Sequence, residues 1–322
     1  MNITEEINKS LLGIVKRAEK QSIEQLVATF VDIGPLFKIL SNIDHQILYG
    51  RRGTGKTHAF NYLANSIKEK GDIVVQIDMR TIGSTGGIIN DTNLPVGERA
   101  TRLLIDTLAE IQNGILRETF EHDYVDFMKI ASKIEELEEK LSEVYVVGQT
   151  EHSEKVNKSK ESKGGLRVNF PKLSFGGEHH KSSNKQTEST LKSTGTEHHR
   201  VHFGAISKIL NEIIANFNHR KLWIFIDEWS EVPIDLQPIL AELLRRCILP
   251  VFGITVKIAA IEQRTNFRVV TKRQQYIGIE VGADIPNSIN LDEYMVFDND
   301  QEKAKKFFQE LLYKHVITSN LD

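Results

Sequence analysis

Eight consecutive residues, Gly50-Arg51-Arg52-Gly53-Thr54-Gly55-Lys56-Thr57, limit the folds open to this chain more than any other stretch of its sequence. They match the pattern G-x-x-x-x-G-K-[S/T] without departure. The apolar run DHQILYG (44–50) precedes the pattern, and the helical pattern THAFNYLANSIKEKG (57–71) follows it. A strand, a glycine-rich turn and a helix start, in that order, surround an anion with backbone N–H groups. The sequence therefore predicts a phosphate-binding loop in an α/β fold, in preference to a chance glycine-rich turn.

The residue types of this loop suit a nucleotide and its magnesium ion. The glycines let the backbone curl so that successive N–H groups face an anion. Lys56 can reach the outer phosphates as a point charge, and the Thr57 hydroxyl can ligate Mg²⁺. We therefore expect Lys56 to act in catalysis and Thr57 to be a metal ligand. The predicted nucleotide-binding residues are Gly50, Arg51, Arg52, Gly53, Thr54, Gly55, Lys56, Thr57 and His58.

A second apolar run, KLWIFIDE (221–228), ends in two carboxylates. Because open α/β sheets bind ligands outside the carboxyl ends of their strands, these acids are expected beside the phosphate loop. Asp227 is predicted to hold the metal through water, and Glu228 to polarise the attacking water as general base. Alone, an apolar strand that ends in acid is common, and most such ends simply meet solvent. Combined with the loop, the two acids favour a nucleoside triphosphate hydrolase over a small-molecule kinase, which needs a second-substrate pocket.

A third apolar run, ITVKIAAIEQRTNF (254–267), ends in polar and basic residues. A side chain at this strand end would lie beside the γ-phosphate and could report its presence. We predict Arg264 for this catalytic role, with Gln263 and Thr265 as rivals and a plain surface arginine as the alternative. Two arginines that follow are candidates to act in trans on a neighbouring subunit: Arg268 and Arg273.

Apolar runs alternate with helical patterns along the chain, which indicates a parallel sheet covered on both faces. The expected strands are 44–50, 72–79, 221–228 and 254–261, with a short edge strand within 289–297. The expected helices are 4–20, 57–71, 98–116, 125–146, 203–217, 236–248 and 298–316. The predicted fold class is α/β: a three-layer P-loop NTPase with a mostly parallel sheet, a helical N-terminal segment and a flexible insertion.

The insertion is predicted from composition, because residues 149–200 are rich in Ser, Lys, Glu, Thr and His and poor in large apolar groups. Alternating apolar positions within it fit a small hairpin at 166–175. Its histidines lack cysteine partners and a fixed helical spacing, so a partner-binding arm or a solvated loop is favoured over a zinc site. The expected divisions are a helical N-terminal segment (1–40), two halves of the NTPase core (41–148 and 201–297) around the insertion, and a C-terminal helix forming a partial lid (298–322).

The charge balance of the chain limits the kinds of partner that it is expected to bind. Its 322 residues include 41 lysines and arginines against 44 acidic residues, a formal net charge of −3. This balance argues against a uniformly basic nucleic-acid binder and leaves room for a local basic patch. The single cysteine, Cys247, cannot form an internal disulfide. The N-terminus mixes charges and has no long apolar run, so we expect a cytoplasmic protein without a signal peptide or membrane contact.

Taken in order, the motifs resemble the AAA+ and STAND branch of P-loop NTPases. They are closest to bacterial origin-recognition-like AAA+ ATPases in four stretches: FVDIGPL (30–36), YGRRGTGKTHA (49–59), DEWSEVPIDLQPILAELLRRCILP (227–250) and VKIAAIEQRTNF (256–267). The resemblance covers 30–145 and 201–300. It implies ATP as ligand, Mg²⁺ as cofactor, and a switch between ATP and ADP states that drives assembly. It also implies that the segment from Phe30 to Gly34 cradles the adenine ring, with an apolar core segment as the alternative.

The same resemblance sets the expected function. Such ATPases usually continue into a helical lid and often a winged-helix DNA-binding domain, whereas one clear helix (298–316) follows the last core strand here. We expect a Mg-dependent ATP-hydrolysing protein whose nucleotide state controls an assembly, with DNA association or antiphage defence as its setting. The alternative is a nucleotide-gated scaffold subunit with little hydrolysis that needs a partner to complete its site. The expected partners are ATP and ADP, then further copies of the chain or an operon-encoded protein, with DNA as a further candidate.

Overall fold

The computed structural model describes residues 21–32, 35–82, 91–120, 125–141, 144–150, 193–199, 202–270, 276–295 and 301–319, together with Asn8 and Leu12. The chain forms two compact units. The larger unit comprises Met1–Glu143 with Arg200–Asp322, and the smaller comprises Val144–His199. The hairpin predicted at 166–175 lies outside the described residues, as does most of the helix predicted at 4–20.

A five-stranded sheet in the order β2-β5-β6-β1-β9 lies at the centre of the larger unit. Every neighbouring pair in it is parallel. The strands are β1 (Gln46–Tyr49), β2 (Ile73–Asp78), β5 (Leu222–Asp227), β6 (Ile254–Ala260) and β9 (Asn287–Asn290). β6 is buried at every position and β5 at all but its last, because both faces of a parallel sheet are covered.

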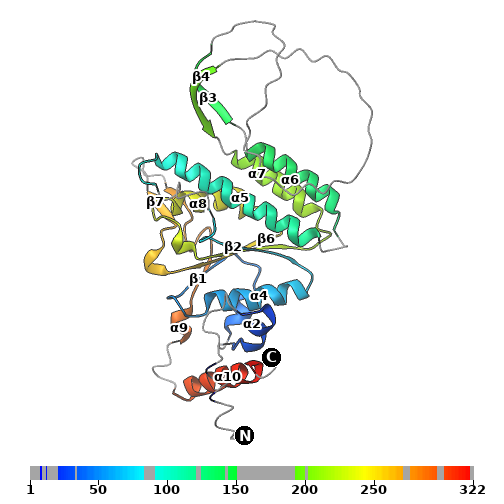
Figure 1. Ribbon diagram of the computed structural model, residues 1–322, viewed down its shortest axis with the longest axis vertical. Helices are drawn as coiled ribbons and strands as arrows, with labels where there is room; N and C mark the ends of the chain where they lie inside the picture. Colours follow the sequence, from blue (N-terminus) through cyan, green and yellow to red (C-terminus); the bar gives the residue numbers. More distant parts are fainter. Residues whose placement is uncertain are drawn as a thin grey trace. The chain divides into compact units, whose positions relative to one another are not determined.

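Helices cover both faces of this sheet (Figure 1). The helices on one face are α2 (Ile23–Thr29), α3 (Leu36–Leu40) and α4 (Lys56–Glu69). The helices on the other face are α5 (Val96–Phe120), α6 (Phe127–Leu141), α7 (Phe203–Ala215) and α8 (Gln237–Leu243). Successive side chains of a strand alternate between the faces, so Phe225 packs with Phe60 of α4 while Ile224 joins the opposite core. The predicted three-layer α/β class is confirmed.

The helix predicted at 125–146 is wrong at its end. α6 stops at Leu141, and Val144–Thr150 forms strand β3, which pairs antiparallel with β4 (Ser193–His199) in the smaller unit. The valines of β3 explain the change, since β-branched side chains favour strands. These two strands lie at the ends of the segment predicted as a polar insertion.

Three features near the C-terminus also differ from the prediction. The helix predicted at 236–248 passes from α8 into a π-helix, Leu244–Ile248. The edge strand β9 begins two residues before the predicted 289–297 and ends at Asn290, and a short helix, α9 (Leu291–Met295), follows it. A hairpin that the sequence did not predict joins β7 (Arg268–Val270) to β8 (Tyr276–Gly278). These strands are short and partly exposed, so they carry little of the apolar signal that marks a strand.

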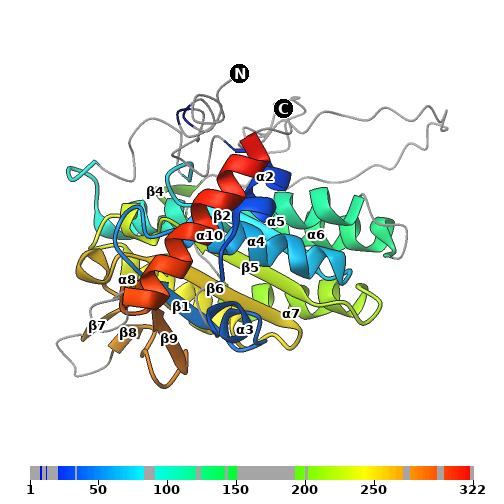
Figure 2. The same ribbon diagram turned by 90° about the horizontal axis from the view of Figure 1, so that it is seen from below.

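The last described helix, α10 (Gln301–Ser319), packs against α2 on the α4 side of the sheet (Figures 1 and 2). Lys314 Nζ on this helix donates a hydrogen bond to the Phe30 carbonyl at 2.7 Å. The C-terminal helix is therefore attached to the segment that precedes the phosphate loop. Within the part of the chain that the structure describes, every helix is too short or too polar to cross a membrane.

Gly114 in helix α5 permits the close approach of this helix to strand β2. A Cβ built on Gly114 would lie 2.5 Å from Cγ1 of the buried Val75. We expect Gly114→Ala to lower the free energy of unfolding by about 1–2 kcal/mol, since overpacking outweighs the gain in helix propensity. Urea unfolding measures the change. Gly97→Ala in the same helix is the control, because its Cβ would have nothing within 4 Å; equal stability of the two variants would contradict the packing argument.

Candidate active site

The parallel sheet brings the predicted site residues to one edge. The chain leaves β1 into the phosphate loop (50–57), leaves β5 at Asp227 and leaves β6 into residues 261–266. Because these strands are neighbours and run the same way, their exits lie side by side at the carboxyl end of the sheet. Strand β2 adds a fourth exit at Asp78, which is paired in register with Asp227.

The phosphate loop has the backbone conformation that its glycines predict. Gly53 and Gly55 have φ angles of 83° and 88°, in the left-handed region that glycine adopts without strain. Gly50, the first residue of the loop, lies close to the Thr54 side chain, since a Cβ on Gly50 would lie 2.6 Å from Thr54 Oγ1. Gly55 directly precedes α4, so the positive end of a 14-residue helix faces the loop. The loop therefore presents backbone amides and a helix dipole to an anion.

Lys56, the predicted phosphate-binding lysine, lies largely inside the loop. Its side chain is 8% exposed, and Nζ donates to the carbonyls of Gly50 and Arg51 at 2.8 and 2.9 Å. Burial lowers the pKa of Lys56, and the nearby carboxylates of Asp227 and Glu228 oppose this shift. The ammonium group is thus held by weak neutral acceptors next to two acids, and an anion can replace those acceptors.

Thr57 and Asp227, the predicted metal ligands, are in direct contact. Thr57 Oγ1 donates to Asp227 Oδ2 at 2.6 Å. Burial raises the pKa of Asp227, with a further rise from Asp78, whereas hydrogen bonds from Thr57 and from the Glu228 amide oppose it. A hydroxyl and a carboxylate fit Mg²⁺, which prefers oxygen ligands and usually keeps several waters. The pair can therefore supply the protein's share of a magnesium site.

Glu228, the predicted general base, has an unusual backbone. Its φ of 55° and ψ of 37° lie in the left-handed region, which is uncommon for residues other than glycine. Burial raises the pKa of Glu228 and the charge of Asp227 raises it further, while Arg80, Lys56 and Arg52 oppose these effects. A strained backbone at a carboxylate beside the predicted metal ligands is the kind of outlier that gathers at functional sites.

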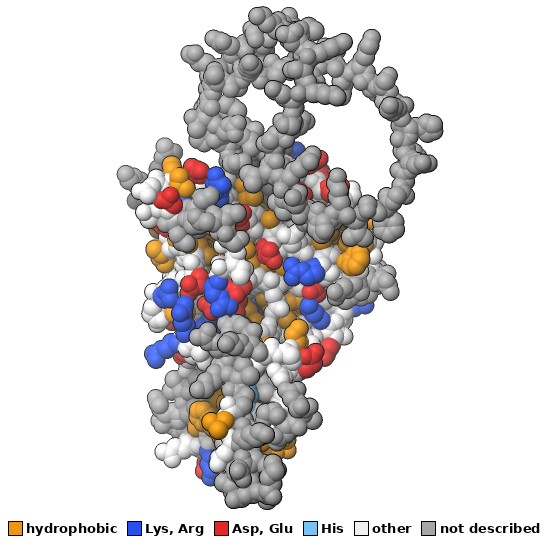
Figure 3. Space-filling model, in the orientation of Figure 1, with side chains coloured by type: hydrophobic (Ala, Val, Ile, Leu, Met, Phe, Trp, Pro, Cys, Tyr) orange, Lys and Arg blue, Asp and Glu red, His pale blue; other side chains and the backbone are white. Residues whose placement is uncertain are grey.

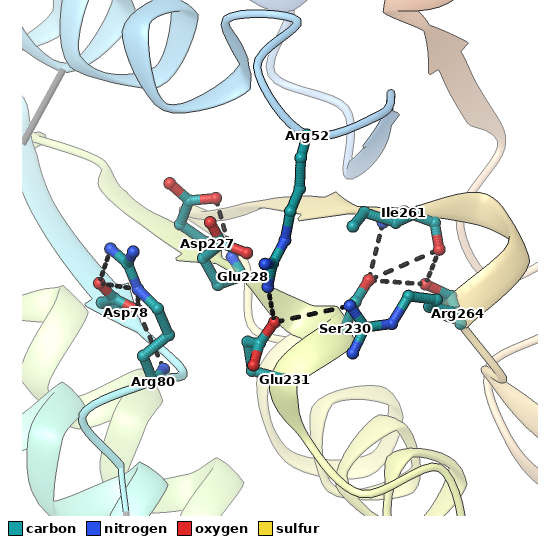
Figure 4. Close-up of polar contacts among 10 residues, drawn as sticks. Arg52, Asp78, Arg80, Asp227, Glu228, Ser230, Glu231, Ile261 and Arg264 are labelled. Atoms are coloured by element: carbon teal, nitrogen blue, oxygen red, sulfur yellow. Dashed lines mark hydrogen bonds and ion pairs between the residues drawn. The ribbon is translucent and has the colours of Figure 1, made fainter. Parts of the chain in front are cut away.

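A carboxylate–arginine pair beside these residues was missed by the sequence reasoning. Asp78 ends strand β2 opposite Asp227, and Arg80 donates to its carboxylate from Nη2 at 2.6 Å and from Nε at 3.0 Å (Figure 4). The run DIVVQIDM (72–79) carried the same signal as the run that ends at Asp227, an acid at the end of an apolar strand.

Arg264, predicted beside the γ-phosphate, lies in a short 3₁₀ turn (Glu262–Arg264) directly after β6. Its Nη1 is 3.9 Å from Glu231 Oε1, and Arg52 of the phosphate loop donates to the same oxygen (Figure 4). The structure therefore brings two predicted arginines together through Glu231, which the sequence reasoning missed. Of the rivals for the position, Thr265 donates to the Ile261 carbonyl at 2.7 Å, and Gln263 is exposed.

Two buried polar side chains hold the Arg264 turn against the acidic end of β5. Ser230 Oγ accepts a hydrogen bond from the Ile261 amide at 2.8 Å. Gln237 Nε2 donates to the Arg264 carbonyl at 3.2 Å, and its Oε1 accepts from the Asn266 amide at 2.7 Å. Both side chains are nearly inaccessible to solvent. The place of Arg264 is thus set by contacts with the segment that follows Glu228.

Other residues assigned to nucleotide binding have partners within the fold. The Arg51 amide donates to both carboxylate oxygens of Asp292, at 3.1 and 3.3 Å. His58 Nε2 lies 2.6 Å from the Leu26 carbonyl, and burial lowers the pKa of His58. The rings of His58 and Phe30 make an edge contact with centroids 5.5 Å apart. Phe30 and His58 therefore lie where the segment before the loop packs on α4.

The all-parallel sheet, the glycine loop at the start of α4 and the acidic end of β5 together form the arrangement of a three-layer α/β P-loop fold. Residues 15–70 match the family model described as ORC-CDC6-like. The matched stretch contains the phosphate loop and α4, and it supports an origin-recognition-like AAA+ family for the chain, as the motifs predicted. Neither a curated protein nor a solved structure matches the chain.

Proposed function

We propose that the chain binds ATP with Mg²⁺ at this site and hydrolyses it. One contact carries the proposal: the Thr57 hydroxyl and the Asp227 carboxylate, 170 residues apart in sequence, are 2.6 Å apart. A chance glycine-rich turn gives no reason for a partly buried acid to meet the first turn of the following helix. Lys56 and Glu228 flank this contact, so phosphate, metal and water would each have a chemically suitable partner.

Each residue of the site has a distinct part in this reaction. The loop amides and Lys56 bind the phosphates, and Thr57 with Asp227 hold Mg²⁺, which when bound neutralises charge on the phosphate oxygens. Glu228 orients the attacking water and accepts its proton. Its raised pKa brings the carboxylate closer to neutral pH, which makes it a better base than an exposed glutamate. Arg264 lies at the strand end where it can meet the γ-phosphate.

The nucleotide state would then control an assembly in the cytoplasm, built from further copies of the chain or with an operon-encoded partner. A nucleotide-gated scaffold with little hydrolysis is the second candidate. The observation that favours it is the pairing of Arg52 and Arg264 with Glu231, since both positive charges already have an anionic partner. Among the described side chains on the face seen in Figure 3, acidic and basic groups are mixed, which does not favour binding to a DNA backbone.

Wild-type protein is expected to bind a fluorescent ATP analogue and to release phosphate from ATP in MgCl₂. Chelation of the metal with EDTA should abolish turnover, because Thr57 and Asp227 then lack the ion that shields the phosphates. Light scattering with ATP and with ADP measures the assembly in the same samples. Absence of nucleotide binding would refute the proposal. ATP-dependent assembly without measurable phosphate release would instead support the scaffold alternative.

A further inference from the structure

The carboxylate of Glu231 bridges two arginines that come from different sides of the proposed site. Arg52, in the phosphate loop, donates to Glu231 Oε1, and Arg264 Nη1 lies 3.9 Å from the same oxygen. In Figure 4, Arg52 extends from its loop to Glu231, with Asp227 and Glu228 to one side and Arg264 to the other. The side chains of Arg52 and Arg264 are 64% and 52% exposed. The bridge can therefore open without any change in the core.

The bridge also lies beside the predicted catalytic groups. Arg52 belongs to the phosphate loop, four positions before Lys56, and Figure 4 shows its side chain beside Glu228 on the way to Glu231. Arg52 therefore lies near the groups that would surround the γ-phosphate. The backbone that carries Arg264 is also held in place. Gln237 donates to the Arg264 carbonyl, and Ser230 accepts a hydrogen bond from the amide of Ile261 at the start of the turn. An anion placed between Lys56 and Glu228 would thus meet two arginines whose partner is already a carboxylate.

We propose that Glu231 stands in for the γ-phosphate of a nucleoside triphosphate, so that the two compete for Arg52 and Arg264. A nucleoside diphosphate has no γ-phosphate and leaves the bridge intact. Glu231 therefore weakens binding of the triphosphate and not of the diphosphate, and it sets how readily the chain enters its triphosphate state. The exchange suits the chemistry, since arginine binds phosphate and carboxylate oxygens in the same way. The inference rests on the proposed function and adds the residue that discriminates ATP from ADP.

Glu231→Gln tests this competition, because it keeps the size of the side chain and removes its charge. We expect the Kd for ATP to fall about threefold, the scale of one exposed ion pair, with the Kd for ADP unchanged. Titration with fluorescent ATP and ADP analogues measures both constants. The matched control is Glu110→Gln, which removes a glutamate that pairs with the exposed Arg117 on helix α5. Neither constant should change in the control.

A merely structural role for Glu231 predicts a different pattern. Loss of such a role would weaken the binding of ATP and ADP alike and lower the midpoint of thermal unfolding. An unchanged ratio of the Kd for ATP to the Kd for ADP would overturn the inference. Glu231→Ala provides a second test of the same ratio. In an Arg52→Ala, Arg264→Ala background the gain from Glu231→Gln should vanish, because no arginine remains to be released. A wild-type protein that binds neither nucleotide would refute the proposed function itself, whereas binding with an unaltered ratio refutes only the competition.

Discussion

The Lys56→Ala variant is expected to bind ATP about a hundredfold more weakly than wild type, because truncating one partner of a buried charge pair costs roughly 2–5 kcal/mol. In the structure, Lys56 Nζ is held by two neutral carbonyls inside the loop, at 2.8 and 2.9 Å. Phosphate oxygens would replace these carbonyls by charge-assisted bonds, which are about twice as strong as neutral ones. An alanine side chain has no charge and no hydrogen-bond donor, so it makes none of these bonds. Titration of a fluorescent ATP analogue in MgCl₂ measures the loss.

A matched control separates this effect from damage to helix α4. Lys68 lies on the same helix, pairs with Glu118 at 2.6 Å and is 39% exposed, so Lys68→Ala removes the same charge away from the loop. We expect this variant to bind ATP like wild type. Thermal unfolding of both variants should stay near that of wild type, because Lys56 holds only carbonyls of its own loop. A Lys56→Ala protein that keeps wild-type ATP affinity would falsify the assignment of the loop.

The central strands could be predicted from sequence because their signals are local. LWIFID in β5 and ITVKIAA in β6 are nearly continuous apolar runs, which are typical of a strand covered on both faces. The edge strand β9 reads NSIN, with a single apolar residue, because an edge strand has a partner on one side only. Its pairing with β1 depends on the rest of the sheet, so the local pattern at 289–297 predicted only its second half.

The residues of the candidate site also fall into two groups, those within local sequence motifs and those brought together only by packing. Lys56, Thr57 and the Asp227-Glu228 pair each belong to a short motif with its own strand or helix boundary, so sequence reasoning could find them. Glu231 follows its motif by three residues but meets Arg52 across 179 positions of sequence. Gln237 reaches the Arg264 turn from another helix. Such contacts arise from the packing of α8 and the strand ends, and the pattern of neither segment contains them.

Glu228→Gln is expected to lower ATP turnover by about a hundredfold or more, the scale on which a general base contributes, while ATP affinity stays near wild type. Glutamine has the same size, and the Glu228 amide that donates to Asp227 at 2.8 Å is unaffected, so the left-handed turn can persist. Phosphate release and nucleotide titration on the same preparation separate the two effects. Glu262→Gln, in the 3₁₀ turn that follows the neighbouring strand β6, is the control for loss of a charge.

The split between turnover and binding decides between the two proposed functions. If wild type releases phosphate and Glu228→Gln binds ATP without releasing it, Glu228 acts on the attacking water and the ATP-dependent assembly should last longer in the variant. Equal turnover in wild type and variant would remove Glu228 from the reaction. If both proteins bind ATP and neither hydrolyses it, the scaffold alternative holds. In that case a protein partner that displaces Glu231 from Arg264 should restore turnover in wild type and leave Glu228→Gln inactive, because Arg264 would then be available to the γ-phosphate while the variant still lacks its base.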